Sequence, residues 1–320
     1  MLVKNYIKKY LFERISRLTG PFEQHYVKTT VLQCLLIAKS NHSKEQIKNL
    51  SSVEFGGFSQ WGEDGIIDWL IEKLSGIPQT FIEFGVEDYR ESNTRLLLYL
   101  RNWRGLVMDG SPEHIKSIKC QDVSWRFDLT ANCAFIDREN INQLIGASGL
   151  SGDIGLLSVD IDGNDYWVWQ AIDVVNPAIV VCEYNAAFGD VHQISVPYQA
   201  DFQRTSAHHS NLYFGASLPA LIELGNQKGY VFVGTNSNGC NAFFVRNDLA
   251  PALMNSIIEI KSFPSLFREA RDSTGQLIFA RGKDRIEIIR HLLVYDFSTR
   301  SIRQLGDIGN LYSSRWQQAN

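Results

Sequence analysis

Five acidic residues directly follow short apolar stretches that are predicted to be strands. They are Glu83, Asp109, Asp128, Asp160 and Glu183. Ligands of open α/β sheets bind outside the carboxyl ends of the strands, so we expect these carboxylates to line one site. Their charge would repel a phosphate-bearing cofactor such as NAD, and no Gly-x-Gly-x-x-Gly motif follows a predicted strand. The group therefore favours a ligand that is cationic and rich in hydroxyl groups.

S-adenosylmethionine (SAM) fits this description, because it carries a sulfonium, an ammonium and a ribose diol. Gly85 follows the first predicted strand, and Asp109 lies 24 residues later. That spacing is similar to the spacing of the ribose-binding acid in dinucleotide folds. We therefore expect Asp109 to accept hydrogen bonds from the ribose hydroxyls and Asp128 to accept one from the adenine amino group.

The elements that must position these residues alternate between strands and helices. Strands are predicted at Thr80–Val86, Leu106–Met108, Val123–Phe127, Ile154–Val159 and Ala178–Cys182, with helices between them. A helix at Ser217–Gln227 then precedes two strands, Tyr230–Val233 and Ala242–Val245, whose short Gly- and Asn-rich connection indicates an antiparallel hairpin. This pattern predicts an α/β fold, a Rossmann-like seven-stranded sheet that is mostly parallel and ends in that hairpin.

Three segments follow from the same reading. Residues 1–50 are expected to be an N-terminal helical segment, 51–250 the α/β domain, and 251–320 a mainly helical extension. Residues 1–20 form a basic amphipathic pattern, and residues 1–30 hold six Lys or Arg against two Glu. Such a helix could pack on its own domain, join a second subunit, or lie on an anionic membrane surface.

The composition is that of a globular protein. The chain of 320 residues is 44% hydrophobic and 21% charged, with a net charge of −4. These values exclude disorder and argue against a nucleic-acid partner. The five cysteines are scattered without a Cys-x-x-Cys pair, which predicts free thiols in a reducing compartment. We expect a cytoplasmic protein, peripheral at the inner membrane surface if residues 1–20 bind lipid.

Five motifs within residues 55–250 resemble the FkbM-like class of SAM-dependent methyltransferases. They are Ser59-Gln60-x-Gly62-Glu63-Asp64, Phe81-Ile82-Glu83-Phe84-Gly85-Val86, Glu91-Ser92-Asn93-Thr94, Trp103-Arg104-Gly105-Leu106-Val107-Met108-Asp109 and Leu157-Ser158-Val159-Asp160-Ile161-Asp162-Gly163-Asn164-Asp165. The resemblance implies a class I methyltransferase fold, SAM as cofactor, and O-methylation of a sugar hydroxyl in a glycan or glycoside of the polysaccharide or lipopolysaccharide type.

The chain departs from the usual methyltransferase pattern after the first strand. It has a single glycine there, Gly85, where a Gly-x-Gly loop is usual. Asn93 and Thr94, near the next helix start, could supply polar contacts to the methionine carboxylate of SAM. The full set of residues expected to contact SAM is Gln60, Glu83, Gly85, Asn93, Thr94, Asp109, Gly110, Ser111, Asp128 and Asp160.

Methylation of a sugar hydroxyl needs a base or a metal ion, because the hydroxyl is a weak acid. Carboxylates and an amide oxygen suit Mg²⁺, and the expected ligands are Asp160, Asp162, Glu183 and Asn185. Alternatively, Asp160, His208 or His209 could act as the catalytic base.

Two other functions compete with methyl transfer. Asp160-Ile161-Asp162 also matches the Asp-x-Asp signal of metal-dependent nucleotide-sugar glycosyltransferases. The chain could also be a non-catalytic protein that binds SAM. Asp109 at its spacing favours the methyltransferase.

Overall fold

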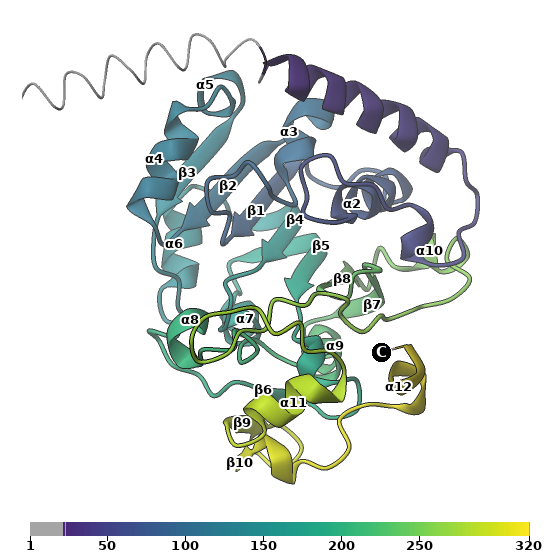
Figure 1. The fold of residues 1–320 in the computed structure, drawn as a ribbon. Coiled ribbons are helices and arrows are strands. Elements are labelled where there is room, and N and C mark those ends of the chain that lie inside the picture. The colour runs from purple at the N-terminus through teal and green to yellow at the C-terminus, as the bar shows by residue number, and fades with distance from the viewer. Residues whose placement is uncertain (1–21, 23, 320) are drawn as a thin grey trace, which may run out of the picture.

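The computed structural model describes residue 22 and residues 24–319 (Figure 1). At its centre is a seven-stranded sheet in the order β3-β2-β1-β4-β5-β8-β7. The strands are β1 (Thr80–Phe84), β2 (Arg104–Asp109), β3 (Leu129–Cys133), β4 (Gly152–Val159), β5 (Val175–Glu183), β7 (Tyr230–Thr235) and β8 (Asn241–Arg246). The first five are parallel, and β8 runs antiparallel to both of its neighbours. The predicted Rossmann-like sheet with its terminal hairpin is confirmed.

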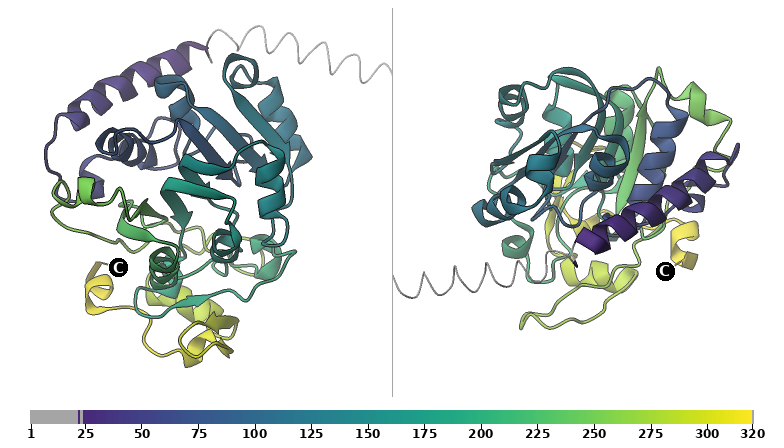
Figure 2. Two further views of the ribbon diagram at one scale, coloured as in Figure 1. Left: turned by 180° about the vertical axis from the view of Figure 1, so that it is seen from behind. Right: turned by 90° about the horizontal axis from the view of Figure 1, so that it is seen from above.

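Helices cover both faces of the sheet, as Figure 2 shows from two further directions. Side chains alternate between the faces of a strand, so Ile82 and Phe84 pack in one core while Phe81 packs in the other. The first core includes α6 (Ile141–Ala147), α7 (Asp165–Ala171) and α9 (Leu218–Gln227). The second includes α2 (Glu63–Lys73), α3 (Arg95–Arg101), α4 (Pro112–Cys120) and α10 (Pro251–Met254). Burial on both faces explains the continuous apolar runs of the central strands.

The strand predicted at Val123–Phe127 is wrong. Val123–Arg126 is the short helix α5, in which Val123 is buried while Trp125 is 78% exposed. The third strand begins only at Leu129 and pairs on one side alone, with β2. Asp128 therefore precedes β3, at the amino end of the strand. It cannot join the acids at the carboxyl edge, and its predicted contact with adenine is wrong as well.

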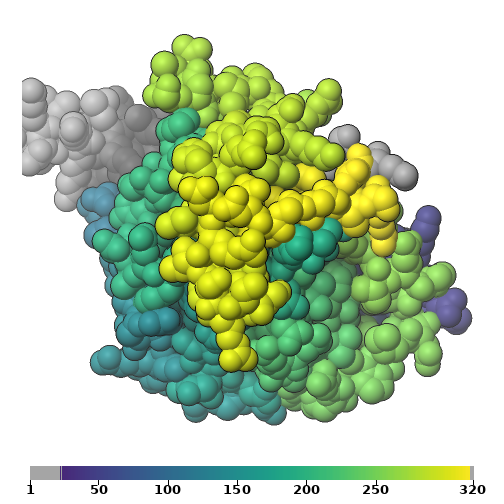
Figure 3. Space-filling model, turned by 90° about the horizontal axis from the view of Figure 1, so that it is seen from below, coloured from purple at the N-terminus to yellow at the C-terminus, as the bar shows by residue number. Residues whose placement is uncertain are grey.

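The C-terminal region contains more than helices. It holds α10, α11 (Lys283–Ile289) and α12 (Ser314–Ala319), but also strands β9 (Leu293–Asp296) and β10 (Ser301–Gln304). These strands pair with each other, and β9 also pairs with the short β6 (Ile194–Ser195). Residues 258–282 contain no helix and no named strand. Figure 3, viewed from below, shows the C-terminal region lying across the α/β core.

The N-terminal part of the described chain is a helix at 24–42, which packs on the core through Cys34. The predicted basic helix at residues 1–20 lies outside the described residues. Within the described residues, none of the helices combines the length and apolar character needed to cross a bilayer. All five cysteines are free, as predicted, and Cys34 and Cys182 are buried.

Candidate functional site

Two adjoining cavities open at the carboxyl edge of the sheet. The larger has a volume of about 310 Å³ and the smaller about 260 Å³. Gly85, Glu87, Asp160 and Asp162 line both cavities, so the two lie side by side. They lie where β1 and β4 are neighbours and the chain turns outward in opposite directions. Ligands of open α/β folds bind at such a switch point.

The smaller cavity combines one carboxylate with apolar walls. Asp109 ends β2 and lines it, and its carboxylate is tightly held. Asp109 Oδ1 accepts hydrogen bonds from Ser111 N at 2.8 Å and faces His114 Nδ1 at 2.9 Å. Asp109 Oδ2 accepts one hydrogen bond from the described residues, from Glu87 N at 2.9 Å. A carboxylate oxygen can accept two hydrogen bonds, so Oδ2 can accept one more. Apolar side chains complete the walls: Met108, Phe135, Ile136, Ile161 and Phe202.

The loop after β1 passes very close to the loop after β4. Gly85 has a φ of +70°, and a Cβ atom there would lie 1.7 Å from the Asp160 carbonyl oxygen. The two following non-glycine residues with left-handed backbone, Glu87 (φ 47°) and Tyr89 (φ 63°), continue the turn. Glu87 N anchors this turn to Asp109.

Glu83 has a structural role that limits its role in binding. Its carboxylate is buried and accepts hydrogen bonds from Asn93 N at 2.8 Å and from Thr94 N at 3.2 Å. The Thr94 hydroxyl donates to the same group. Burial raises the pKa of Glu83 to about 7, although these donors oppose the shift. Glu83 and Asn93 still line the larger cavity, whereas Thr94 does not.

The Ser59–Asp64 motif holds a loop in place. Asp64 Oδ2 accepts hydrogen bonds from the backbone N–H groups of residues 57, 58 and 59, at 2.7, 2.6 and 2.9 Å. Glu63 Oε1 accepts from the Asn236 and Asn241 side chains, at 2.7 and 3.0 Å. The motif thereby fixes the loop that presents Gln60 to the larger cavity.

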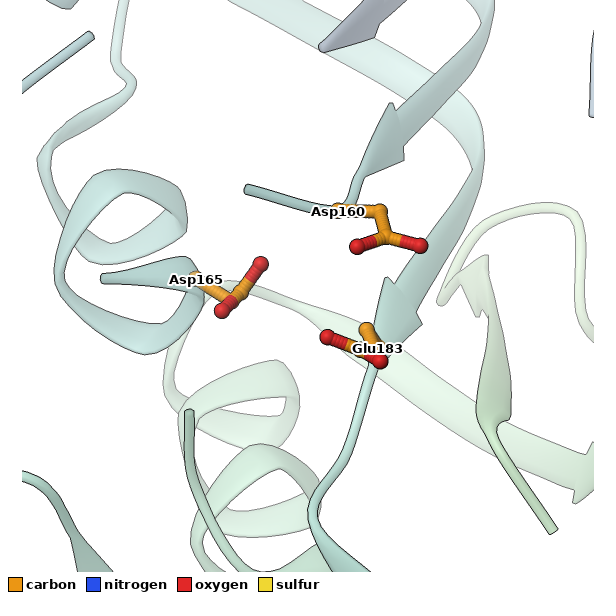
Figure 4. A group of neighbouring side chains, drawn as sticks. All are labelled: Asp160, Asp165 and Glu183. Atoms are coloured by element: carbon orange, nitrogen blue, oxygen red, sulfur yellow. The ribbon is translucent and has the colours of Figure 1, made fainter. Parts of the chain in front are cut away.

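Two carboxylates face each other at the junction of the cavities. Asp160 follows β4 and Glu183 ends β5, which is paired with β4 in parallel. Oxygen atoms of Asp160, Glu183 and Asp165 lie within 4.8 Å of one another (Figure 4). Burial raises the pKa of both Asp160 and Glu183 well above the ordinary values. The charges of Asp162 and Asp165 raise the pKa of Asp160 further, and the charge of Asp160 raises that of Glu183. Glu183 Oε2 is buried and accepts no hydrogen bond from the described chain.

The remaining members of the predicted metal set have other partners. Asp162 turns to Arg204, with Nη1 at 2.7 Å from Oδ1. Asn185 Oδ1 accepts from Ala187 N, and its amide nitrogen donates to the carbonyls of Leu212 and Phe214. Asp165 is closer to the pair, but its oxygens accept from Ile161 N and Gly163 N at 2.8 and 2.9 Å. Among these described residues, Asp160 and Glu183 are the acids whose oxygens accept no N–H hydrogen bond, so they are the least engaged candidates for a cation.

Several predicted residues lie away from the cavities. His208 and His209 line neither cavity, and His208 Nδ1 lies 2.8 Å from the Ser210 hydroxyl. Ser111 caps α4 through its hydroxyl, whereas Gly110 lines the smaller cavity. Asp128 is at the opposite end of its strand, near Arg104 at 3.6 Å.

Sequence reasoning missed the residues that reach the larger cavity from other parts of the chain. They are Arg204, Ser265, Phe267, Glu269 and Arg285. Four of these five come from residues 265–285, which were assigned to a separate extension. Asp165 was present in a quoted motif, but nothing in its spacing distinguished it from Asp162.

Comparisons with known proteins give structural matches only. No family model matches the sequence, and no curated protein does. A SAM-dependent methyltransferase from Clostridium acetobutylicum aligns at 10% identity with a TM-score of 0.36, covering 57% of this chain and 90% of its own. An O-methyltransferase from Bacillus cereus in complex with SAH aligns at 10% identity with a TM-score of 0.34. The alignment covers 68% of this chain and 89% of the Bacillus cereus protein. The CurJ carbon methyltransferase aligns at 10% identity with a TM-score of 0.37. The alignment covers 73% of this chain and 69% of the CurJ chain.

Proposed function

We propose that this protein is a class I, SAM-dependent O-methyltransferase that acts on a sugar hydroxyl of a glycan or glycoside. The observation that carries the proposal is the pair of adjoining cavities at the switch point of the sheet. One cavity has apolar walls and Asp109, and the other has Asp160 and Glu183. This division matches a donor with an adenosine moiety on one side and a hydroxylated acceptor on the other.

The residues around the smaller cavity fit an adenosine. Phe135, Ile136 and Phe202 offer apolar surfaces to a planar ring. Asp109 Oδ2 retains one acceptor position, which a ribose hydroxyl can use. Gly85 leaves the backbone open where the two cavities meet, since any side chain there would collide with Asp160. SAM, when bound, supplies the methyl group from its sulfonium.

Asp160 and Glu183 are the candidates for the chemistry on the acceptor. A carboxylate with a raised pKa is a stronger base than an ordinary one, and the ionised member of the pair can accept a proton. Such a base accepts the proton of the sugar hydroxyl as the oxygen attacks. His208 and His209, expected as alternatives, are not among the residues that line the two cavities.

A divalent cation could assist the same pair of residues. Glu183 Oε2 has no hydrogen-bond donor in the described chain, and Asp160 faces it, which fits an oxygen-binding ion such as Mg²⁺. The ion would be held by Asp160 and Glu183 rather than by the four residues first expected. It would act as a Lewis acid toward the acceptor hydroxyl.

The alternative of a nucleotide-sugar glycosyltransferase has weaker support. Asp162, the second acid of Asp160-Ile161-Asp162, is engaged by Arg204. A metal-bound diphosphate would need that carboxylate to be free. Retained SAM binding without turnover on any glycan would instead favour a non-catalytic SAM-binding protein.

The proposal is tested by calorimetric titration with SAM and S-adenosylhomocysteine. We expect wild-type protein to bind both and Asp109→Ala to bind them at least about tenfold more weakly, since a hydrogen bond to a charged group contributes about 1.5–3 kcal/mol. Asp128→Ala is the matched control, because it removes the same charge at the other end of the sheet, and it should bind normally. Equal affinities for the two variants would refute the ribose role of Asp109.

A further inference from the structure

Arg285 is a buried guanidinium with no acidic partner. Only 4% of the residue is exposed, and it lines the larger cavity from α11. Among the described residues, its sole hydrogen bond runs from Nη2 to the Ser265 carbonyl at 3.2 Å. Its Nε is buried without an acceptor, and no carboxylate of the described chain lies within 4.0 Å of it. Burial lowers its pKa below the ordinary value.

The other buried or half-buried arginines near this edge are compensated. Arg204, which lines the same cavity, contacts the carboxylates of Asp162 and Glu269. Arg95 is as buried as Arg285, and its Nε also lacks an acceptor. Its guanidinium, however, lies over the rings of Phe58, Tyr89 and Tyr99 and donates from Nη1 to two oxygens. A buried charge without a partner costs several kcal/mol of stability. The position of Arg285 is therefore costly to the free protein and is explained by a ligand.

The cavity around Arg285 suits an anion at one end and a hydroxyl at the other. Acidic side chains gather where Asp160 and Glu183 lie, whereas the groups that interact with Arg285 are Tyr312, Cys240, Arg268 and Tyr184. A guanidinium binds carboxylate and phosphate oxygens with directed N–H donors. Nη1 of Arg285 makes no hydrogen bond to a described residue, so its two N–H groups remain available.

We propose that Arg285 recognises an oxyanion on the acceptor, so that the substrate is an acidic sugar carrying a carboxylate or a phosphate. This inference rests on the proposed function for the identity of the acceptor as a sugar. The anion pairs with Arg285, and the hydroxyl to be methylated lies toward Asp160 and Glu183. Arg285 is then a specificity-determining residue that is supplied by the C-terminal region.

The test is calorimetric titration of the full chain with three sugars. D-glucuronate carries a carboxylate, D-glucose 6-phosphate carries a phosphate, and D-glucose carries neither. We expect one or both acidic sugars to bind at least tenfold more tightly than D-glucose, and the comparison between them identifies the anion. Arg285→Met should remove this preference, and Arg285→Lys should retain part of it.

Arg290→Gln is the matched control, because Arg290 caps the same helix and is exposed. It should keep the full preference. Arg285→Met should unfold at the same temperature as the wild type or higher, whereas a structural arginine would lower it on removal. The proposal is overturned if wild-type protein binds all three sugars equally, or if Arg285→Met keeps the preference.

S-adenosylhomocysteine affinity separates this inference from the proposed function. It should be unchanged in Arg285→Met. A large loss there would assign Arg285 to the donor carboxylate and overturn its role toward the acceptor. Wild-type protein that binds the acidic sugars but not S-adenosylhomocysteine would sustain the anion site and defeat the methyltransferase.

Discussion

Asp160 and Glu183 keep two carboxyl groups close together with few protein donors around them. Asp160 accepts no hydrogen bond from a backbone or side-chain N–H of the described chain, and Glu183 Oε2 accepts none. Two like charges at this separation cannot both ionise without cost. The free protein therefore binds protons at this pair more tightly than the unfolded chain does, and its stability falls as pH rises above the ordinary carboxyl values.

Glu183→Gln should relieve this cost. The folded-state pKa of Glu183 is raised above its ordinary value of 4.5, so its contribution to stability is present at low pH and lost as pH increases. At pH 8 without divalent ions, we expect the variant to unfold at a higher temperature than the wild type, by about 2–4 °C for each kcal/mol regained. At pH 5 the difference should be smaller. Activity should be lost at both pH values.

Calorimetry from pH 5 to pH 8 measures this trend. Glu45→Gln, at an exposed position of the chain, is the control and should show no such dependence. A variant at Glu183 that is less stable than the wild type at pH 8 would show that the carboxylate is compensated in the folded protein.

At the scale of elements, the loops after β1 and β4 form one unit. Gly85 allows the two loops to touch, and Asp109 at the end of β2 ties the first loop through Glu87. The close backbone contact at Gly85 and Asp160 lies where the two cavities share their lining residues.

Gly85→Ala should therefore damage both stability and donor binding. The new Cβ would meet the Asp160 carbonyl, and overpacking of this kind costs about 1–3 kcal/mol in addition to the strain of left-handed backbone. Gly76→Ala is a matched control, because Gly76 has a φ of +81° and no atom within 4 Å. Urea unfolding should show a clearly larger decrease in the free energy of unfolding for Gly85→Ala than for Gly76→Ala. Equal losses at the two positions would mean that the loops can separate freely.

Central elements were predictable and peripheral ones were not. β1, β4 and β5 are buried on both faces, so their apolar runs and terminal acids are visible in the sequence. β3 is an edge strand with the sequence Leu-Thr-Ala-Asn-Cys, which lacks such a run, and the more apolar Val123–Phe127 was chosen instead. Asp109 ends β2, as predicted, whereas Asp128 precedes β3.

At the scale of the whole molecule, the larger cavity depends on chain segments that are distant in sequence. Trp61 contacts Phe267 edge to face, with ring centroids 5.7 Å apart, and so joins the loop before α2 to residues 258–282. Local periodicity cannot report contacts of this kind. The sequence alone therefore could not predict that Arg285 and Glu269 line the larger cavity.

We also propose that the basic N-terminus binds an anionic membrane surface. Each lysine near such a surface contributes about 1 kcal/mol, so replacing Lys4, Lys8 and Lys9 with alanine should reduce binding to phosphatidylglycerol vesicles by more than tenfold. Vesicle sedimentation at low salt measures the effect. Replacing Lys116, Lys119 and Lys283 makes the same charge change at exposed positions of the described chain, and it should leave binding intact. If both triple variants bind the vesicles more weakly, the attraction depends on the overall charge of the protein and not on the N-terminal lysines.

The two cavities are lined by different parts of the chain, and this difference has an evolutionary consequence. Strand ends contribute to both cavities, whereas the segment from Ser265 to Arg285 lines only the larger one. Asp109 and Met108, which line the smaller cavity, end strand β2 of the central sheet. The segment from Ser265 to Arg285 is irregular for most of its length. Under the proposed function, exchange of this segment between related chains would change the acceptor while the cavity beside Asp109 keeps its residues.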